Sequence, residues 1–448
     1  MMNRFSRLCW VSFALVVMAR GAIADPLPIG VARVDVTPDG PIRLNGFLVR
    51  EAESKGVQQR IWAKALAIGP DAGASVLVTI DNLGIPDAIT EEIAARLNKK
   101  VGLKREQLAI GASHTHTAPC LKGITPNIFG KPIPPDQMGR IEAYTNSLVD
   151  KLERVCLDAL ADRRPGTLGW AKGEVDFARN RRTPGGPVDH GLPMLRAVDA
   201  EGKIRAIVVG YACHCTTLDP KENLVAGDWA GEAQEAIEAN HPGAVAMVAI
   251  GCGADSNPMN RPGQEVARRH GCSIATEVDR LLKGTFTPLN SAPKGKVARV
   301  PLPFDTLPTR KELEDLVAKG GPPGYNAKLN LERLDRGEPL QAELDYVIQS
   351  WAFGDDLVMV FLAGEVVVDY SLRMRKELDP SRQWVVGYAN DLPCYIPSER
   401  ILKEGGYEGG GAMVYYGRPT RLKPGVEDRI FDAIRGIVPA GFRTPGAN

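Results

Sequence analysis

The sequence predicts an α/β fold in which a mixed β-sheet core is flanked by helices, within a single large domain. Three observations support this prediction. Short apolar runs alternate with longer segments of helical periodicity. The composition, 44% hydrophobic and 24% charged over 448 residues, is ordinary for a globular protein of this size. The most distinctive polar residues directly follow the apolar runs.

Apolar runs in the first part of the chain predict strands. Residues 29–37 alternate apolar and polar side chains and end at the turn Pro38-Asp39-Gly40. Residues 75–80 and 245–250 are continuous apolar runs, which are typical of buried strands. We expect strands at 29–37, 61–69, 75–80, 107–110, 166–175, 204–212 and 245–250.

The intervening segments have the apolar spacing of amphipathic helices. Residues 87–100 place Ile89, Ile93 and Leu97 on one face, with acids early and lysines late, as the helix dipole favours. We expect helices at 87–100, 141–161, 228–239 and 264–282.

The pattern changes after residue 284. Residues 284–339 contain many prolines and short charged helices, and we expect an irregular excursion from the core. The core resumes with strands at 357–362 and 384–388, separated by a helix that ends at Leu378. Residues 405–411 are predicted to form a glycine-rich loop.

The charge balance and the N-terminus limit the classes of partner that we expect for this protein. Lysine plus arginine (55) nearly cancels aspartate plus glutamate (54), so no basic field for nucleic acid is expected. Residues 1–24 combine two arginines, an apolar run and Ala22-Ile23-Ala24, which predicts a cleaved signal peptide and a secreted or periplasmic chain at 25–448. No later segment approaches the roughly 20 apolar residues of a membrane span. We therefore expect a small-molecule or lipid substrate and at most transient contact with a membrane surface.

The segment Ser113-His114-Thr115-His116 is the strongest candidate site. If it is extended, residues i and i+2 project to the same side, so His114 and His116 face one space. Two imidazoles at a strand end suit a divalent metal, most often zinc. With only six histidines, about one chain in ten would contain H-x-H by chance, so the motif is suggestive by itself.

Other polar residues also follow predicted strands, where ligands bind in α/β sheets. A catalytic zinc takes three protein ligands and keeps a position for water. His214 is a second candidate ligand, and Glu365, at a predicted helix start, can supply an oxygen. Taken singly, a histidine with satisfied hydrogen bonds and an acid at a helix start are the commoner explanations of these two residues.

Several segments resemble the neutral (non-lysosomal) ceramidase family. Residues 113–119 are similar to its S-H-T-H-S-G-P motif, and residues 30–37 to its G-x-G/A-R-x-D-I-T opening. Residues 387–391 resemble its late block, and Tyr395 and Tyr407 keep the interval of twelve residues between two family tyrosines. The resemblance runs from about residue 29 to 411 in the family's order.

The resemblance implies a catalytic domain that binds one zinc ion. The implied ligands are two histidines, a glutamate and a tyrosine: His114, His214, Glu365 and Tyr395.

The resemblance also implies roles for residues beside the metal. His116 would be the general base or acid, and Tyr407 would contact the scissile carbonyl. Arg181 matches the arginine of the family's N-R-S motif. Ser256 would stand for a serine on the headgroup side of the substrate.

The chain departs from the family in three places. The family's G-D-V-S-P-N segment is changed, because Asp255 stands beside Ser256 and the order of proline and asparagine is inverted. Arg182 replaces the serine of the N-R-S motif. About 40 residues follow Tyr407, too few for the family's C-terminal immunoglobulin-like domain of roughly 100 residues, so we expect the catalytic domain alone.

The activity that the resemblance implies is zinc-dependent hydrolysis of the N-acyl bond of ceramide or a ceramide-like lipid. The products would be a fatty acid and an amine, which is sphingosine if the substrate is ceramide. Three alternatives remain open: a metal hydrolase of the same fold that acts on another N-acyl compound or an ester, a TIM-barrel amidohydrolase, and a non-catalytic exported protein that binds zinc.

Overall fold

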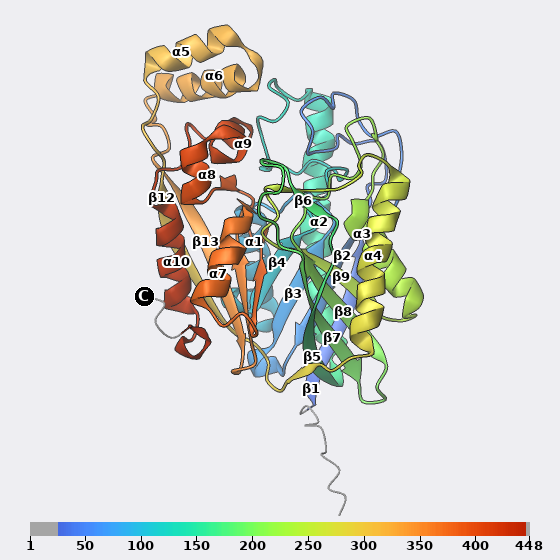
Figure 1. Ribbon diagram of the computed structural model, residues 1–448. Coiled ribbons are helices and arrows are strands. Elements are labelled where there is room, and N and C mark those ends of the chain that lie inside the picture. The colour runs from blue at the N-terminus through green and yellow to red at the C-terminus, as the bar shows by residue number, and fades with distance from the viewer. Residues whose placement is uncertain (1–25, 445–448) are drawn as a thin grey trace, which may run out of the picture.

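The structure is a computed structural model that describes residues 26–444, so the predicted signal peptide lies outside the described residues. Two sheets occupy its centre, with α3 and α4 along one side and α7 and α10 along the other (Figure 1). The mixed α/β fold predicted from the sequence is confirmed. Among the described residues, no helix has both the length and the apolar character needed to cross a membrane.

The larger sheet follows the strand order β4-β3-β2-β1-β5-β7-β8-β9, and β11 pairs with β5. The pairs β3–β4 and β8–β9 are parallel, and the other pairs along the path are antiparallel. A TIM barrel needs eight parallel strands, so that alternative is wrong. The strands are β1 (Leu27–Asp35), β2 (Trp62–Ile68), β3 (Ser75–Ile80), β4 (Leu108–Ala112), β5 (Arg164–Glu174), β7 (Gly191–Asp199), β8 (Ile204–Tyr211), β9 (Val245–Ile250) and β11 (Thr287–Leu289).

The second sheet has the order β12-β13-β14-β16. Its first two pairs are antiparallel and its last pair is parallel. A buried cluster contains side chains from both sheets, including Leu66, Met247, Trp351 and Phe361, so the sheets pack against each other. The strands are β12 (Lys294–Pro303), β13 (Glu343–Phe353), β14 (Leu357–Leu362) and β16 (Gln383–Val386).

The helices cover the outer faces through a larger buried cluster. In α2, apolar residues recur at helical spacing, as at Leu148, Leu152 and Val155, and this face packs on β1 and β2. The longer helices are α1 (Asp87–Val101), α2 (Pro135–Ala161), α3 (Asp228–Asn240), α4 (Gln264–Leu282), α5 (Arg310–Lys319), α6 (Gly321–Asp335), α7 (Val368–Glu377) and α10 (Val426–Ile437).

Some elements differ from the sequence predictions. The stretch at 284–339 contains the helices α5 and α6, as expected, but also the strand β12, which pairs with β13 over ten residues. The predicted loop at 405–411 is wrong: α8 (Glu399–Glu404) is followed by Gly405, then by α9 (Gly406–Gly409) and by a 3-10 helix over Gly411–Tyr416. Gly405 and Gly406 have φ of 70° and 80°, so glycine permits the sharp turn between the two helices.

The cysteines of the described residues are free thiols. Cys272 is partly exposed and the other six are buried. Burial raises the pKa of the Cys120 and Cys394 thiols to about 12, so these groups stay protonated at neutral pH.

Candidate functional site

Short backbone pairings outside the two sheets bring distant segments to one place. β15 (Glu365–Val366) pairs in parallel with β17 (Tyr395–Ile396), and this register sets Glu365 opposite Tyr395. A parallel bridge between Thr115 and Cys215 sets the H-x-H segment beside His214. These pairings hold five of the residues predicted from the sequence, which come from four separate regions of the chain.

A third pairing builds the neighbouring wall. β6 (Ala178–Asn180) pairs antiparallel with β10 (Ser256–Pro258), and Ser256 lies opposite Asn180. The backbone N–H of Arg181 donates to the carbonyl of Asp255 at 2.8 Å, which fixes the start of the Arg181 side chain.

The three histidines direct their Nε2 atoms to one centre. His114 Nε2 lies 3.3 Å from Glu365 Oε2, and His214 Nε2 lies 3.1 Å from the same oxygen. His116 Nε2 lies 3.2 Å from His114 Nε2. Donor atoms of His114, His116 and His214 all lie within 4.8 Å of one another, so this buried group could bind a metal ion.

Backbone carbonyls hold the other nitrogen of each ring. The Nδ1 atoms of His114, His116 and His214 lie 2.7, 2.9 and 2.8 Å from the carbonyl oxygens of Leu83, Gly46 and Gly253. A carbonyl can only accept, so each Nδ1 donates its proton and leaves Nε2 with a free lone pair in the neutral ring. This is the arrangement by which proteins orient histidine ligands of metals.

Glu365 fits a metal as well. Its side chain is buried, and Oε2 has no hydrogen-bond donor within the described residues. Its Oε1 accepts a hydrogen bond from the hydroxyl of Tyr416. An unpaired buried carboxylate oxygen is costly unless a cation satisfies it, so the donor set suits a divalent ion.

Burial keeps the imidazoles of His214 and His116 neutral. It lowers the pKa of His214 to about 4, with the nearby Arg181 charge acting in the same direction. It also lowers the pKa of His116 well below its ordinary value, and the neighbouring His114 and His214 add to the effect. His116 is therefore an unprotonated base at neutral pH.

The route by which His114 and His116 meet differs from the prediction. An extended segment would direct residues i and i+2 to the same side, but β4 ends at Ala112 and His114 has φ of 57°. The left-handed conformation turns the backbone at His114, and the two rings meet edge to face with centroids 4.8 Å apart. The prediction that both face one space is correct, and the extended geometry behind it is wrong.

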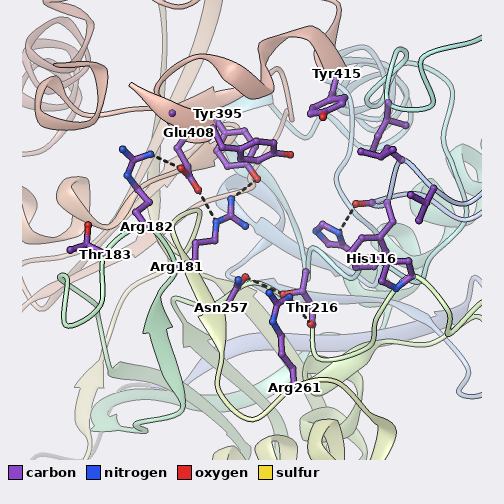
Figure 2. A pocket seen from close by; sticks show the side chains of 18 residues that line it. His116, Arg181, Arg182, Thr183, Thr216, Asn257, Arg261, Tyr395, Glu408 and Tyr415 are labelled. Carbon is purple, nitrogen blue, oxygen red and sulfur yellow. Dashed lines mark hydrogen bonds and ion pairs between the residues drawn. The ribbon is translucent and has the colours of Figure 1, made fainter. Parts of the chain in front are cut away.

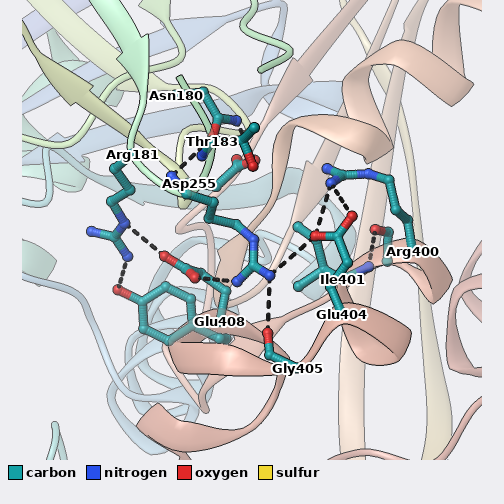
Figure 3. Close-up of polar contacts among 12 residues, drawn as sticks. Asn180, Arg181, Thr183, Asp255, Arg400, Ile401, Glu404, Gly405 and Glu408 are labelled. Carbon is teal, nitrogen blue, oxygen red and sulfur yellow. Dashed lines mark hydrogen bonds and ion pairs between the residues drawn. The ribbon is translucent and has the colours of Figure 1, made fainter. Parts of the chain in front are cut away.

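Arg181 connects the candidate metal site to a network of charged side chains. Its Nη2 donates to the Tyr395 hydroxyl at 2.9 Å, and its Nε donates to Glu408 at 2.7 Å. Glu408 also accepts from Arg182 at 2.6 Å, so one carboxylate lies between two guanidinium groups (Figure 3). Burial would raise the pKa of Glu408, but Arg181 and Arg182 hold it below its ordinary value. The carboxylate is ionised and holds Arg181 in place.

A cavity of about 760 Å³ opens onto this centre (Figure 2). Four of the predicted site residues line it: His116, Arg181, Tyr395 and Tyr407. His114, His214 and Glu365 do not line it and are buried. The arrangement places a candidate base and two phenols where a substrate could reach them, beside buried candidate metal ligands.

The structure does not bring Ser256 to the cavity. Its side chain is fully buried, and Oγ has no hydrogen-bond partner within the described residues. Asn257, the next residue, lines the cavity instead. Side chains alternate in direction along β10, so Asn257 faces the cavity while Ser256 faces the interior.

Sequence reasoning missed Glu408 and Tyr416. Glu408 directly follows Tyr407, and the adjacent Arg181 and Arg182 required a carboxylate partner, a signal that was available in the sequence. Nothing in the spacing indicated Tyr416, because its contact with Glu365 depends on the 3-10 helix at Gly411–Tyr416.

Comparison with known proteins gives a family and several relatives. Residues 27–255 match the family described as "Neutral/alkaline non-lysosomal ceramidase, N-terminal". The neutral ceramidase of Pseudomonas aeruginosa is 28% identical over 243 residues, which are 50% of this chain and 35% of that protein. The neutral ceramidase of Drosophila melanogaster is 24% identical over 257 residues, 52% of this chain and 35% of that protein. The matches thus span about a third of the length of these relatives.

Solved structures agree in fold. The crystal structure of neutral ceramidase from Pseudomonas aeruginosa superposes with a TM-score of 0.70 at 20% identity, covering 86% of this chain and 71% of that one. A structure described as ceramidase complexed with C2 gives a TM-score of 0.68 at 20% identity, covering 89% and 72%. The family match includes His114, His116, Arg181 and His214, and it extends over half of the sequence. The chain belongs to the neutral/alkaline non-lysosomal ceramidase family.

Proposed function

We propose that this protein is an exported, zinc-dependent amide hydrolase that cleaves the N-acyl bond of ceramide or a ceramide-like lipid. The observation that supports the proposal best is the convergence of two histidine Nε2 atoms on the unpaired Oε2 of Glu365, at 3.3 and 3.1 Å. This centre adjoins a cavity in a chain of the ceramidase family. Export rests on the predicted signal peptide alone.

The metal ligands in this proposal are His114, His214, Glu365 and Tyr395. Zinc bound there would supply a water of lowered pKa and a positive charge beside the scissile carbonyl. Tyr395 receives a hydrogen bond from Arg181 at 2.9 Å, so its hydroxyl is oriented toward the centre, 3.4 Å from His214 Nε2.

His116 moves the proton in this proposal. Its Nδ1 is fixed on the carbonyl of Gly46, and its ring lines the cavity beside the metal ligands. Because its pKa is lowered, the free Nε2 can accept a proton from the attacking water and then pass it to the leaving amine.

Tyr407 and Arg181 stabilise the charge that forms on the carbonyl oxygen. The Arg181 guanidinium lies 5.6 Å from the ring centroid of Tyr395 and 5.5 Å from that of Tyr407. Donors held in place before the reaction lower its barrier, because they need no reorganisation as the negative charge develops.

The test measures zinc content and ceramide hydrolysis in the native chain and in His114→Ala. We expect about one zinc per chain in the native protein and loss of both zinc and activity in the variant. His241→Ala is the matched control, because His241 pairs with Asp279 at 2.7 Å, at the end of α3. A His114→Ala protein that keeps both zinc and activity would refute the site assignment.

A second candidate is a hydrolase of the same fold that acts on another N-acyl compound or on an ester. The observation that favours it is the altered segment around Ser256, where Asn257 faces the cavity. Assays with ceramide, N-acyl amino acids and simple esters separate these substrates. A chain that retains zinc and turns over none of them would instead be a binding protein.

A further inference from the structure

The wall of the cavity is divided into an apolar part and a polar part. The apolar side chains come from the loop at 47–49 and from Ile128. Leu48 and Val49 are 46% and 63% exposed. Thr216, Asn257 and Arg261 group together, and Tyr415 lies on the opposite side (Figure 2). The residues of the apolar part are Phe47, Leu48, Val49 and Ile128. Such a cavity suits an amphipathic ligand.

Two of the three arginines in the wall already have carboxylate partners. Arg181 and Arg182 pair with Glu408 at 2.7 and 2.6 Å, and Arg182 also reaches Glu404 at 3.2 Å. These contacts neutralise the two guanidinium groups within the protein. Neither guanidinium is therefore free to pair with a second carboxylate or phosphate that a ligand carries throughout binding.

Arg261 lacks such a partner. Within the described part of the chain, its hydrogen bond is from Nη1 to the carbonyl of Thr216 at 3.4 Å, and no carboxylate lies within ion-pair distance. The acid that attracts it electrostatically is Asp228, but Asp228 is buried and its oxygens accept the backbone N–H groups of Leu218 and Trp229. The guanidinium at the cavity thus retains its charge uncompensated.

Asn257 adds a second donor beside this charge. The Thr216 hydroxyl donates to Asn257 Oδ1 at 3.2 Å. This contact uses the amide oxygen and leaves the amide NH₂ group to donate toward the cavity that Asn257 lines. A guanidinium fork with an adjacent amide donor matches the planar oxygens of a carboxylate or those of a phosphate.

We propose that Arg261 and Asn257 bind an anionic oxygen group on the amine portion of the substrate, while the apolar wall holds the acyl chain. The inference rests on the proposed function as an amide hydrolase. It predicts that, among N-acyl amphiphiles, the enzyme prefers those with an acidic head. The shared chemistry comes from two sources, a carboxylate as in an N-acyl amino acid or a phosphate as in a ceramide phosphate.

The experiment compares charged and neutral substrates of matched chain length. One pair is N-dodecanoylglycine and N-dodecanoylethanolamine, and the other is a ceramide and its phosphate ester. We expect a lower KM for the charged member of at least one pair, and that pair identifies the anion. In Arg261→Gln, the KM for this charged substrate should rise by roughly tenfold to a hundredfold, the range for losing a hydrogen bond to a charged group.

The remaining readouts separate the anion site from general damage. The kcat and the KM for the neutral member should stay unchanged in Arg261→Gln, and Arg261→Lys should recover part of the loss. Arg268→Gln is the control, because Arg268 pairs with Glu265 on the exposed side of α4 and should leave all constants unchanged. Equal KM values for both members of both pairs, or a KM for the charged member that Arg261→Gln does not alter, would overturn the inference and leave the amide hydrolase standing.

A direct binding measurement distinguishes failure of the proposed hydrolase activity from failure of the anion site. Calorimetric titration with N-dodecanoylglycine and with the ceramide phosphate, for the native chain and Arg261→Gln, needs no turnover. Tighter binding of either acid by the native chain, without hydrolysis of any amide, would support the anion site and contradict the proposed function. Equal binding of both acids by the two proteins would overturn the anion site.

Discussion

At the scale of single residues, the histidine centre depends on which nitrogen of each ring is held. The Nδ1 atoms donate to the carbonyls of Leu83, Gly46 and Gly253. Each Nε2 therefore points toward the centre. The geometry alone treats His114, His116 and His214 alike, whereas the proposed mechanism gives His116 a different role. Glu365 contacts His114 and His214, and His116 lines the cavity, which supports this division.

His116→Ala tests the division directly. We expect zinc content to stay near that of the native chain and kcat to fall by about 10²–10⁴, the usual contribution of a general acid or base. Elemental analysis and ceramide turnover on the same preparation measure both. A variant that loses its zinc would make His116 a ligand.

Tyr416→Phe tests how Glu365 is held. The substitution removes the hydroxyl that donates to Glu365 Oε1 and leaves a second unpaired carboxylate oxygen. We expect zinc affinity to fall by about 10- to 100-fold, as for other partners of metal ligands. Competition with a chelator gives the affinity.

Tyr144→Phe is the matched control for this test. It removes a hydroxyl that donates to the carbonyl of Val36 at 2.7 Å, so zinc affinity should be unchanged. Equal affinities in Tyr416→Phe and the native chain would show that Tyr416 does not support the site.

At the scale of elements, the loop that contains Gly46 fixes both a wall of the cavity and the orientation of His116. Gly46 has φ of 91°, and its carbonyl accepts from His116 Nδ1 at 2.9 Å. A Cβ at this position would lie 2.5 Å from the His116 ring. Close approach and a left-handed backbone both require glycine here.

Gly46→Ala should therefore displace the His116 imidazole. We expect kcat to fall by about 100-fold, which is the scale of a displacement of roughly 1 Å at a catalytic group, together with a lower Tm. Gly40→Ala is the control, because a Cβ there meets nothing within 4 Å. Unchanged kcat in Gly46→Ala would mean that the loop yields without moving His116.

The strands show which parts of the fold could be predicted from the sequence and why. The bounds of β3 and β9 were predicted to the residue. A short continuous apolar run between two turns is best explained by a buried strand. β12 was missed because its sequence contains no continuous apolar run. One face of the strand is exposed and carries lysine and arginine. The pairing of Glu365 with Tyr395 came only from the family resemblance, since no local signal reports contacts over 30 residues.

At the scale of the whole molecule, the segment after β16 joins the two sheets. Asn390 accepts from the backbone N–H of Ile110 in β4 and donates to Gln349 in β13. Next to it, Asp391 accepts from the backbone N–H of Asp87 at the start of α1. Burial raises the pKa of Asp391 from its ordinary 3.8 to about 6, and the charge of Asp87 adds to this.

This shift makes the stability of the fold depend on pH. Because the folded pKa of Asp391 lies above the unfolded one, this residue binds more protons in the native state between pH 3.8 and 6, and its contribution to stability falls as pH rises through that window. In Asp391→Asn, whose amide oxygen can still accept the backbone N–H groups of Asp87 and Leu392, this fall should be absent. At pH 7 the variant should be more stable by up to about 2–3 kcal/mol.

Urea unfolding at pH 4, 5, 6 and 7 measures the effect. Some slope should remain, because burial also raises the pKa of Asp255 to about 6. The exposed Asp39→Asn should leave the native slope unchanged. An identical slope in Asp391→Asn would contradict the assignment.

The buried free thiols of this fold offer a way to time its opening. Among the described residues, a maleimide should react quickly with Cys272 alone and reach the six buried thiols only when the surrounding structure opens. Cys156 lies in α2 on the larger sheet, and Cys394 lies between β16 and β17. Mass spectrometry of labelled peptides during denaturation would therefore show whether the region around α2 and the segment after β16 open together or one after the other.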